Sequence, residues 1–212
     1  IIALAKERGV PVKDAAAQKL DALCGGVVHQ GVAAMAACHD FSTMEDIFAK
    51  AGDQPPFVII CDNIEDPHNL GAIIRTAEAA GAHGVIIPKR RGVGLTATVA
   101  KTSAGAVEYM PVVRVANIVS TIEELKQKGL WIFCADMDGK PWCSADMGGP
   151  IGIVVGAEGS GVSRLTKEHC DFVVSLPMNG QVNSLNASVA AAIVIYEAVR
   201  QRSGLPAFTS NK

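Results

Sequence analysis

Three short segments of the chain place polar side chains and glycine directly after an apolar run, at residues 62–75, 155–161 and 176–188. Between them they supply amides, hydroxyls, carboxylates and one arginine, which can bind a polar ligand and move a proton. In open sheets of parallel strands, ligands bind beyond the carboxyl ends of the strands, where such segments lie. Neither GxGxxG nor GxxxxGKS/T occurs, so a dinucleotide fingerprint and a phosphate-binding P-loop are both without support.

The first segment begins as a polar loop and continues as an amphipathic helix. Its apolar positions have the i, i+3, i+4, i+7 spacing of a buried stripe: Leu70, Ile73, Ile74 and Ala77. Arg75 lies about 100° around the helix from Ile74, so its guanidinium can point into a cleft or into solvent. Asn69 must act from the start of the helix. A capping asparagine and a solvated arginine would also explain these two residues.

The second and third segments offer a carboxylate and a group of small polar side chains. Glu158 stands between glycines, which let a backbone approach a ligand closely, although a plain glycine-rich turn is the alternative. At the start of a predicted helix, the third segment has four small polar residues, of which capping explains two at most: Asn183, Ser184, Asn186 and Ser188. Its apolar residues can hold a flat base: Leu176, Met178 and Leu185.

Alternating strand and helix patterns must position these segments. Apolar runs predict six strands, at residues 57–61, 84–88, 110–115, 130–135, 151–155 and 172–176. Helical patterns lie between or after them, at residues 69–80, 96–103, 117–128, 163–169 and 184–202. Because the strand hydrophobicity is continuous rather than alternating, we expect an α/β fold with a parallel sheet flanked by helices on both faces.

Residues 1–36 follow a different pattern and are too few for a core of their own. They predict one amphipathic helix over residues 12–23 and a glycine-rich strand or turn after it. We therefore expect a domain remnant over 1–36, a linker over 37–52 that includes a short capped helix, and the α/β domain over 53–212. The chain does not begin with methionine, which suggests that it starts inside a longer protein.

Composition predicts a soluble globular protein of a reducing compartment. Of the 212 residues 49% are hydrophobic, which argues against disorder, and no apolar stretch approaches the roughly 18 residues of a membrane span. The net charge of −2 means that any RNA contact requires local cationic clusters. The six cysteines lack metal-ligand spacing, so we expect no disulfide framework, no metal, and a cytoplasmic location.

Taken together and in this order, the three segments resemble the SpoU/TrmH class of SPOUT RNA 2′-O-ribose methyltransferases. The similar stretches, within residues 57–202, are DPHNLGAIIRTAEAAGAHGVIIPK, IVVGAEGSGVSRL and LPMNGQVNSLNASVAAAIVIYEAVRQR. The resemblance implies a C-terminal trefoil knot, S-adenosyl-L-methionine bound in that knot, and a homodimer. Residues 1–36, with HQG at 29–31, resemble the end of the small L30e-like RNA-binding domain of bacterial 23S rRNA (guanosine-2′-O-)-methyltransferases.

The same resemblance implies roles for individual residues. Arg75 would be the catalytic arginine, with Asn69 as its motif partner. The rest of the catalytic set would be Glu158, Ser184 and Asn186. The cofactor pocket would involve Gly156, Gly159, Leu176, Met178 and Leu185. RNA contacts would come from Lys89, Arg90, Arg91 and His68, and also from Arg114, although a basic triplet after a strand is often only a solvated loop.

The implied activity is 2′-O-methylation of a guanosine ribose in 23S rRNA. The ribose hydroxyl would attack the methyl group in line and lose one proton. Arg75 can act as a transiently neutral base, which the strong basicity of a guanidinium group opposes, or as a cation that holds phosphate and polarises the hydroxyl. Within the same family tRNA is the alternative substrate. From other classes, the alternatives are a dinucleotide-dependent oxidoreductase and a non-catalytic RNA-binding protein.

Overall fold

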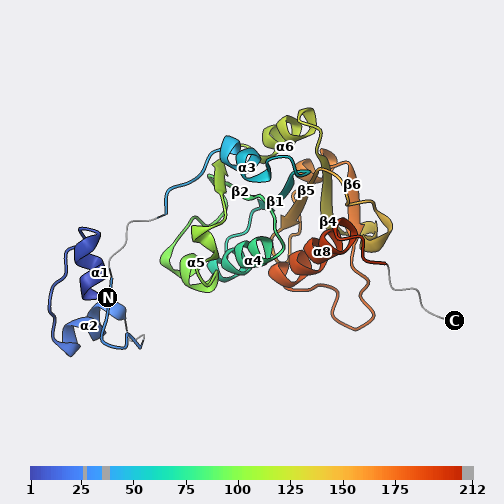
Figure 1. Ribbon diagram of the computed structural model, residues 1–212. Helices are drawn as coiled ribbons and strands as arrows, with labels where there is room; N and C mark the ends of the chain where they lie inside the picture. Colours follow the sequence, from blue (N-terminus) through green and yellow to red (C-terminus); the bar gives the residue numbers. More distant parts are fainter. Residues whose placement is uncertain (26–27, 35–38, 207–212) are drawn as a thin grey trace. The chain divides into compact units, whose positions relative to one another are not determined.

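The computed structural model describes residues 1–25, 28–34 and 39–206, and the chain forms two compact units, Ile1–Ala37 and Cys38–Lys212 (Figure 1). The N-terminal unit contains helices α1 (Ile2–Glu7) and α2 (Ala17–Cys24), neither of which has a buried residue. The helix expected over residues 12–23 is wrong in its first part, because Ala16 is extended and offers no side-chain cap. With so little burial, packing contributes little to the stability of these helices.

The C-terminal unit is built on a six-stranded sheet whose paired strands all run parallel, in the order β3-β2-β1-β5-β4-β6. The strands are β1 (Phe57–Asp62), β2 (Gly84–Pro88), β3 (Val112–Val115), β4 (Trp131–Pro141), β5 (Ile151–Gly156) and β6 (Phe172–Ser175). The central strands are buried over nearly their whole length, which confirms the expected parallel α/β architecture. The trefoil knot and the L30e-like character of residues 1–36 stay predictions.

Two helical layers cover the sheet (Figure 1). One layer holds α4 (Pro67–Ala79), α5 (Ala97–Thr102) and α8 (Ala187–Arg202), and the other holds α3 (Met44–Ala51), α6 (Ile118–Gln127) and α7 (Arg164–Glu168). Short 3-10 turns, η1 (Ala106–Glu108) and η2 (Trp142–Ser144), follow α5 and β4. Successive residues of β1 point into opposite layers, since Ile59 belongs to the core cluster of the first and Ile60 to that of the second.

Helix α3 packs as part of the C-terminal unit, whereas its residues were expected to lie in a linker over 37–52. A capping box starts the helix: the Thr43 hydroxyl accepts from the Asp46 backbone N–H, and the Asp46 carboxylate accepts from the Thr43 backbone N–H. Ile47 is fully buried in the core of the second layer. Burial of such a side chain stabilises by about 1.5–3 kcal/mol, enough to hold this short helix on the sheet.

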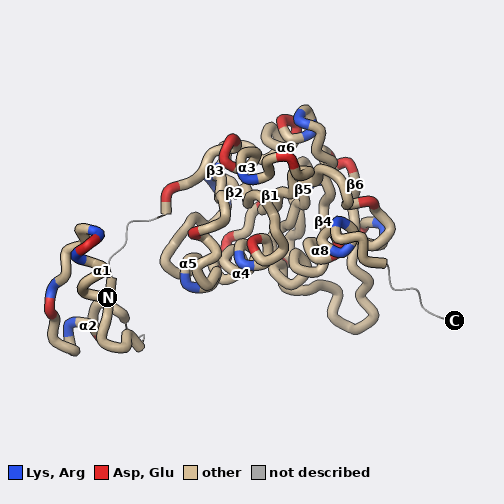
Figure 2. The backbone as a smooth tube through the Cα atoms, in the orientation of Figure 1, with Lys and Arg blue, Asp and Glu red and all other residues tan. Residues whose placement is uncertain are grey.

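The charged residues of the C-terminal unit are dispersed. Figure 2 shows lysine and arginine positions interspersed with aspartate and glutamate along the chain. With charges of both signs interspersed and a net charge of −2, any contact of lysine or arginine with RNA must come from short local stretches. Within the described ranges, no helix has the length and the apolar character to cross a membrane.

Candidate active site

Three side chains, one from each polar segment, are joined by hydrogen bonds. The Asn186 Nδ2 donates to the Asn69 Oδ1 over 2.9 Å and to the Glu158 Oε2 over 3.1 Å. The Asn69 Nδ2 donates to the same carboxylate oxygen over 3.4 Å. The fold thus brings together three of the residues that were expected to be catalytic, in what we term the Asn69–Glu158–Asn186 cluster. Two amide donors hold one carboxylate in place.

Asn69 is positioned by the way α4 begins. Asp66 caps this helix by accepting from the His68 backbone N–H over 2.9 Å, and Pro67 occupies the first helical position, where its missing N–H is harmless. Asn69 therefore lies in the first turn, with only 6% of its surface exposed. The alternative in which Asn69 merely caps the helix is excluded, because the cap is Asp66.

Asn186 does cap a helix, but the cap uses only the oxygen of its amide. The Oδ1 accepts from the backbone N–H groups of Ser188 and Val189, over 3.0 and 3.4 Å, and from the Ser188 hydroxyl over 2.6 Å. The Nδ2 is left to donate to Asn69 and Glu158. Asparagine can do both because its amide carries an acceptor and two donors. The start of α8 therefore sets the orientation of the group that holds Glu158.

The loop after β5 presents Glu158 on a tight turn. Ala157 and Gly161 exchange backbone hydrogen bonds of 3.1 and 2.9 Å, and Gly159 between them has φ +92°, a conformation that favours glycine. Gly156 has no room for a side chain, since a Cβ there would lie 2.1 Å from the carbonyl carbon of Gly161. The backbone conformation of this loop is therefore closely constrained at the carboxyl end of the sheet.

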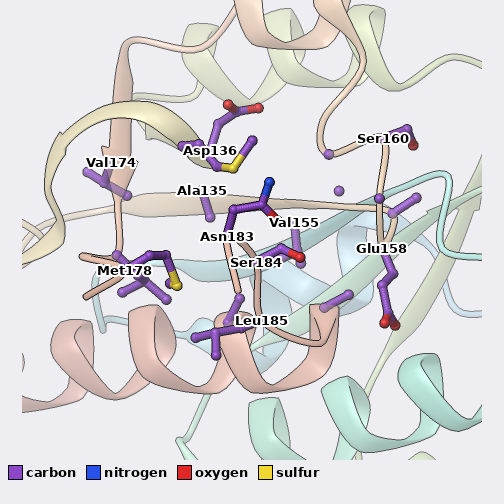
Figure 3. Close-up of a pocket in the computed structure, with 18 residues that line it drawn as sticks. Ala135, Asp136, Val155, Glu158, Ser160, Val174, Met178, Asn183, Ser184 and Leu185 are labelled. Carbon is purple, nitrogen blue, oxygen red and sulfur yellow. The ribbon is translucent and has the colours of Figure 1, made fainter. Parts of the chain in front are cut away.

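A cavity adjoins the cluster between the ends of β4, β5 and β6 and the start of α8 (Figure 3). All five residues that were expected at the cofactor line it: Gly156, Gly159, Leu176, Met178 and Leu185. Glu158, Asn183 and Ser184 add polar groups. Apolar side chains beside a few polar ones suit a nucleoside with a charged tail, so the residues present fit S-adenosylmethionine. We refer to this space as the first cavity.

The contribution of β4 to the first cavity was missed by the sequence reasoning. Asp136 and Met137 line the cavity because the strand continues past residue 135, where it was expected to end. The Asp136 carboxylate pairs with Lys167 over 2.9 Å and Asp138 pairs with the same ammonium over 3.0 Å, which raises the pKa of Lys167. Asp136 could have been found from the sequence, because it is a polar residue directly after an apolar run, as in the three polar segments.

A second cavity shares Ala157, Glu158 and Ser160 with the first. Its other lining residues come from the loops after β1 and β2 and from the start of α4: Asn63, Ile64, Glu65, Asp66, Asn69 and Arg91. The Val93 backbone N–H donates to the Ile64 carbonyl over 2.9 Å and ties the two loops together. The Asn69–Glu158–Asn186 cluster thus lies where ligands in the two cavities would meet.

The remaining candidate residues are distributed around this site. Arg75 is exposed on α4 and lines neither of the two cavities. Lys89 and Arg90 are exposed in the loop after β2, and Arg91, also exposed, lines the second cavity. His68 is exposed at the start of α4, with its Nδ1 3.4 Å from the hydroxyl of a threonine on α5. Of the cationic triplet, Arg91 therefore lines the second cavity together with the start of the first polar segment, whereas Arg75, at the end of that segment, lies outside both cavities.

Cys61 lies near the end of β1, at the same end of the sheet, and is fully buried. Burial raises the pKa of the Cys61 thiol to about 12, so this cysteine stays protonated and unreactive. Over the residues that the structure describes, no group of three or more His, Cys, Asp or Glu side chains could hold a metal ion.

Solved structures with the same fold indicate the class of protein. The SpoU methyltransferase AviRb from Streptomyces viridochromogenes, in complex with the cofactor AdoMet, is similar with a TM-score of 0.70 and 30% identity, over 78% of this chain and 66% of that one. The A. aeolicus TrmH/SpoU tRNA modifying enzyme is similar with a TM-score of 0.63 and 29% identity, over 74% of this chain and 83% of that one. The fold is that of an S-adenosylmethionine-dependent RNA methyltransferase.

The chain belongs to the SpoU rRNA methylase family, whose model matches residues 56–196. A second model, for RNA 2′-O ribose methyltransferase substrate binding, matches residues 1–41. The putative TrmH family tRNA/rRNA methyltransferase YacO of Bacillus subtilis is 47% identical over 206 residues, which are 96% of this chain and 82% of that protein. The 23S rRNA (guanosine-2′-O-)-methyltransferase RlmB of Ralstonia nicotianae is 46% identical over 204 residues, with the same two shares. Family membership excludes the oxidoreductase alternative.

Proposed function

We propose that this enzyme transfers a methyl group from S-adenosylmethionine to the ribose 2′-hydroxyl of a guanosine in 23S rRNA. The observation that carries the proposal is the position of the Asn69–Glu158–Asn186 cluster at the junction of two cavities, one of which has the lining expected for the cofactor. The 46% identity to a 23S rRNA guanosine methyltransferase supports the substrate. The match of residues 1–41 to a substrate-binding model supports an RNA-binding N-terminal unit. We include the L30e-like character of this unit and a cytoplasmic location in the proposal.

The proposed roles follow from where the residues lie. When bound, S-adenosylmethionine supplies a methyl group activated by a sulfonium charge. The glycines of the loop after β5, together with Leu176, Met178 and Leu185, would hold the adenosine portion of the cofactor. Glu158, fixed by its two amide donors, accepts a hydrogen bond from the ribose and aligns the 2′-hydroxyl. Ser184 lines the same cavity and completes the polar set.

Arg75 requires a partner to reach the reacting hydroxyl, because it lies outside both cavities. RNA or a second copy of the chain must supply the rest of its surroundings.

Helix α8 offers a face for a second copy: Val189, Ile193 and Tyr196 have i, i+4, i+7 spacing and keep 48%, 37% and 49% of their surface exposed. We therefore include a homodimer, and a trefoil knot at the C-terminal end of the α/β domain, in the same proposal.

Methyl transfer to purified RNA tests the substrate. The 212-residue chain is incubated with methyl-labelled S-adenosylmethionine and either unmodified 23S rRNA or unmodified tRNA, and the labelled nucleoside is identified after complete digestion. We expect 2′-O-methylguanosine from 23S rRNA alone. Label from tRNA alone would replace rRNA by tRNA as substrate, and label on a base would contradict ribose chemistry.

Calorimetric titration tests the location of the cofactor. We expect saturable binding of S-adenosylhomocysteine and none of NAD. Leu185→Trp fills the first cavity and should abolish binding, whereas Leu165→Trp on α7, where the residue is 58% exposed and lines neither cavity, should leave it unchanged. Undiminished affinity in Leu185→Trp would contradict the assignment of the first cavity to the cofactor.

A further inference from the structure

The second cavity contains two charged side chains that make no hydrogen bond or ion pair within the described part of the chain, Glu65 and Arg91. Its other charged groups are already engaged. Asp66 caps α4, and Glu158 accepts from two asparagines. A carboxylate and a guanidinium therefore line one cavity with their hydrogen-bonding capacity unused, beside the cluster at which methyl transfer is proposed.

The backbone around this cavity is held in an uncommon conformation at two places. Asn63, in the loop after β1, has φ +60°, and Arg91, in the loop after β2, has φ +58°. Left-handed backbone is uncommon for residues other than glycine, and such positions concentrate at functional sites. The two loops follow neighbouring parallel strands and are joined by the hydrogen bond from Val93 to Ile64. The loop that carries Arg91 is thus fixed against the loop that carries Glu65.

We propose, building on the function proposed above, that the second cavity receives the base of the target nucleotide and that Arg91 and Glu65 select guanine. Guanine carries two acceptors, O6 and N7, which a guanidinium binds in a bidentate manner. Its Watson–Crick edge also carries two donors, N1–H and the N2 amino group, which a carboxylate can accept together. An arginine and a free carboxylate in one cavity match both sets.

The other bases fit this pair of side chains less well. Adenine has a donor amino group next to N7, where the Arg91 guanidinium also offers only donors. It has an acceptor at N1, where the Glu65 carboxylate also offers only acceptors. Uracil offers one donor, N3–H, to the carboxylate. The arrangement also places the ribose correctly, since a base in the second cavity and the cofactor in the first would meet at Glu158, which lines both.

Guanosine analogues that each lack one hydrogen-bonding group of the base test the inference. RNA with guanosine, inosine or 7-deazaguanosine at the methylated position is compared by kcat/KM. Inosine lacks the N2 amino group, and 7-deazaguanosine lacks the N7 acceptor. The unaltered enzyme should lose about tenfold on each analogue. Glu65→Gln should abolish most of the preference for guanosine over inosine, and Arg91→Ala, which removes the donors to O6 and N7, most of the preference over 7-deazaguanosine.

Two further measurements make the result decisive. S-adenosylhomocysteine affinity should be unchanged in both variants, and Glu124→Gln, which alters an exposed carboxylate on α6 that lines neither cavity, should keep every ratio. If Glu65→Gln and Arg91→Ala still transfer methyl groups and keep the original ratios, base selection by these residues is wrong although the methyltransferase function stands. If the unaltered enzyme methylates no guanosine in RNA, the proposed function fails first and the base selection with it.

Discussion

The Nδ2 of Asn186 lies 2.9 Å from the Oδ1 of Asn69, although 117 positions separate the two residues in the chain. The same Asn186 side chain caps α8 through its oxygen. One residue therefore links the start of a helix to the geometry of the candidate catalytic carboxylate. A change that keeps the cap but alters the donor separates these two duties.

Asn186→Asp is such a change. It keeps an oxygen for the α8 cap but places a second carboxylate beside Glu158, which is unfavourable for two ionised groups. We expect turnover to fall at least about tenfold, equivalent to about 1.4 kcal/mol, with little change in thermal stability. Asn117→Asp, at the cap of α6, is the matched control and should keep full activity. Equal losses in both variants would show that the effect is one of capping.

Arg75→Ala should remove activity without affecting the fold. Its side chain is exposed, and substitutions at such positions usually change stability by no more than about 0.5 kcal/mol. We expect unchanged unfolding and unchanged S-adenosylhomocysteine binding, but loss of methyl transfer, which Arg75→Lys does not restore if the guanidinium itself is needed. Glu78→Ala, also exposed on α4, serves as control. Full activity of Arg75→Lys would eliminate a specific guanidinium role.

Gly156→Ala should destabilise the protein and close the first cavity. The added Cβ would lie 2.1 Å from the backbone carbonyl carbon of Gly161, in the loop after β5. Overpacking of this kind costs about 1–3 kcal/mol or more. Gly149→Ala, where nothing lies within 4 Å, is the control. Urea unfolding and cofactor titration measure both effects. A Gly156→Ala protein of normal stability and affinity would contradict this packing.

Charge reversal of Lys89 and Arg90 tests the proposed RNA contact while leaving Arg91 in the second cavity. Both side chains are exposed, so the double substitution to glutamate should not alter cofactor affinity. RNA affinity should fall, and the slope of log affinity against log salt should decrease by about 1.4 to 1.8 if two phosphate contacts are lost. An unchanged salt slope would remove these residues from the RNA-contacting surface.

Stability should decrease on mild acidification because of His83. Its buried ring accepts a hydrogen bond at Nδ1 from the Phe57 backbone N–H over 2.9 Å, and burial, followed by the nearby Arg202 and Lys50 charges, lowers its pKa. Below about pH 6.5 the unfolded chain binds a proton that the folded chain resists, so the free energy of unfolding falls as pH falls.

Urea unfolding at pH 7.5 and at a pH of about 5.5 measures this effect. His83→Asn keeps an acceptor for Phe57 but does not titrate, and so should lose less stability over the same interval. If the variant and the unaltered protein lose the same amount, the pH dependence comes from other groups.

Much of the fold could be predicted because local pattern and tertiary structure agree. The apolar run before Asp62 is a buried strand, and the stripe that contains Leu70 and Ile74 is the buried face of α4. The same reasoning about strand ends predicted that polar loops gather at the carboxyl edge of the sheet, whereas the five residues proposed to bind the cofactor, which line one cavity there, were implied by the family resemblance. The hydrophobic pattern does not predict secondary structure correctly where side chains are not buried, as in residues 12–16, which were expected to be helical.

What could not be predicted depends on which strands are neighbours. Asn69 and Glu158 meet because β1 lies beside β5, and nothing in either segment specifies that order. Arg114 shows the same limit at the side-chain level. It was expected to contact RNA, and its guanidinium lies 4.4 Å from the centre of the Phe41 ring, a residue far away in sequence. A role of Arg114 in RNA contact stays a prediction.

The long sequence separations within the cluster also bear on how the enzyme is made. Asn69 reaches Glu158 across 89 positions and Asn186 across 117, so the candidate active centre has no local precursor. Contacts of such long range form late and slowly during folding, and a chain emerges from the ribosome from its N-terminal end. Until residue 186 has emerged, the nascent polypeptide lacks one of the two amide donors that hold Glu158. A prematurely terminated product that ends before this point should therefore be inactive toward RNA.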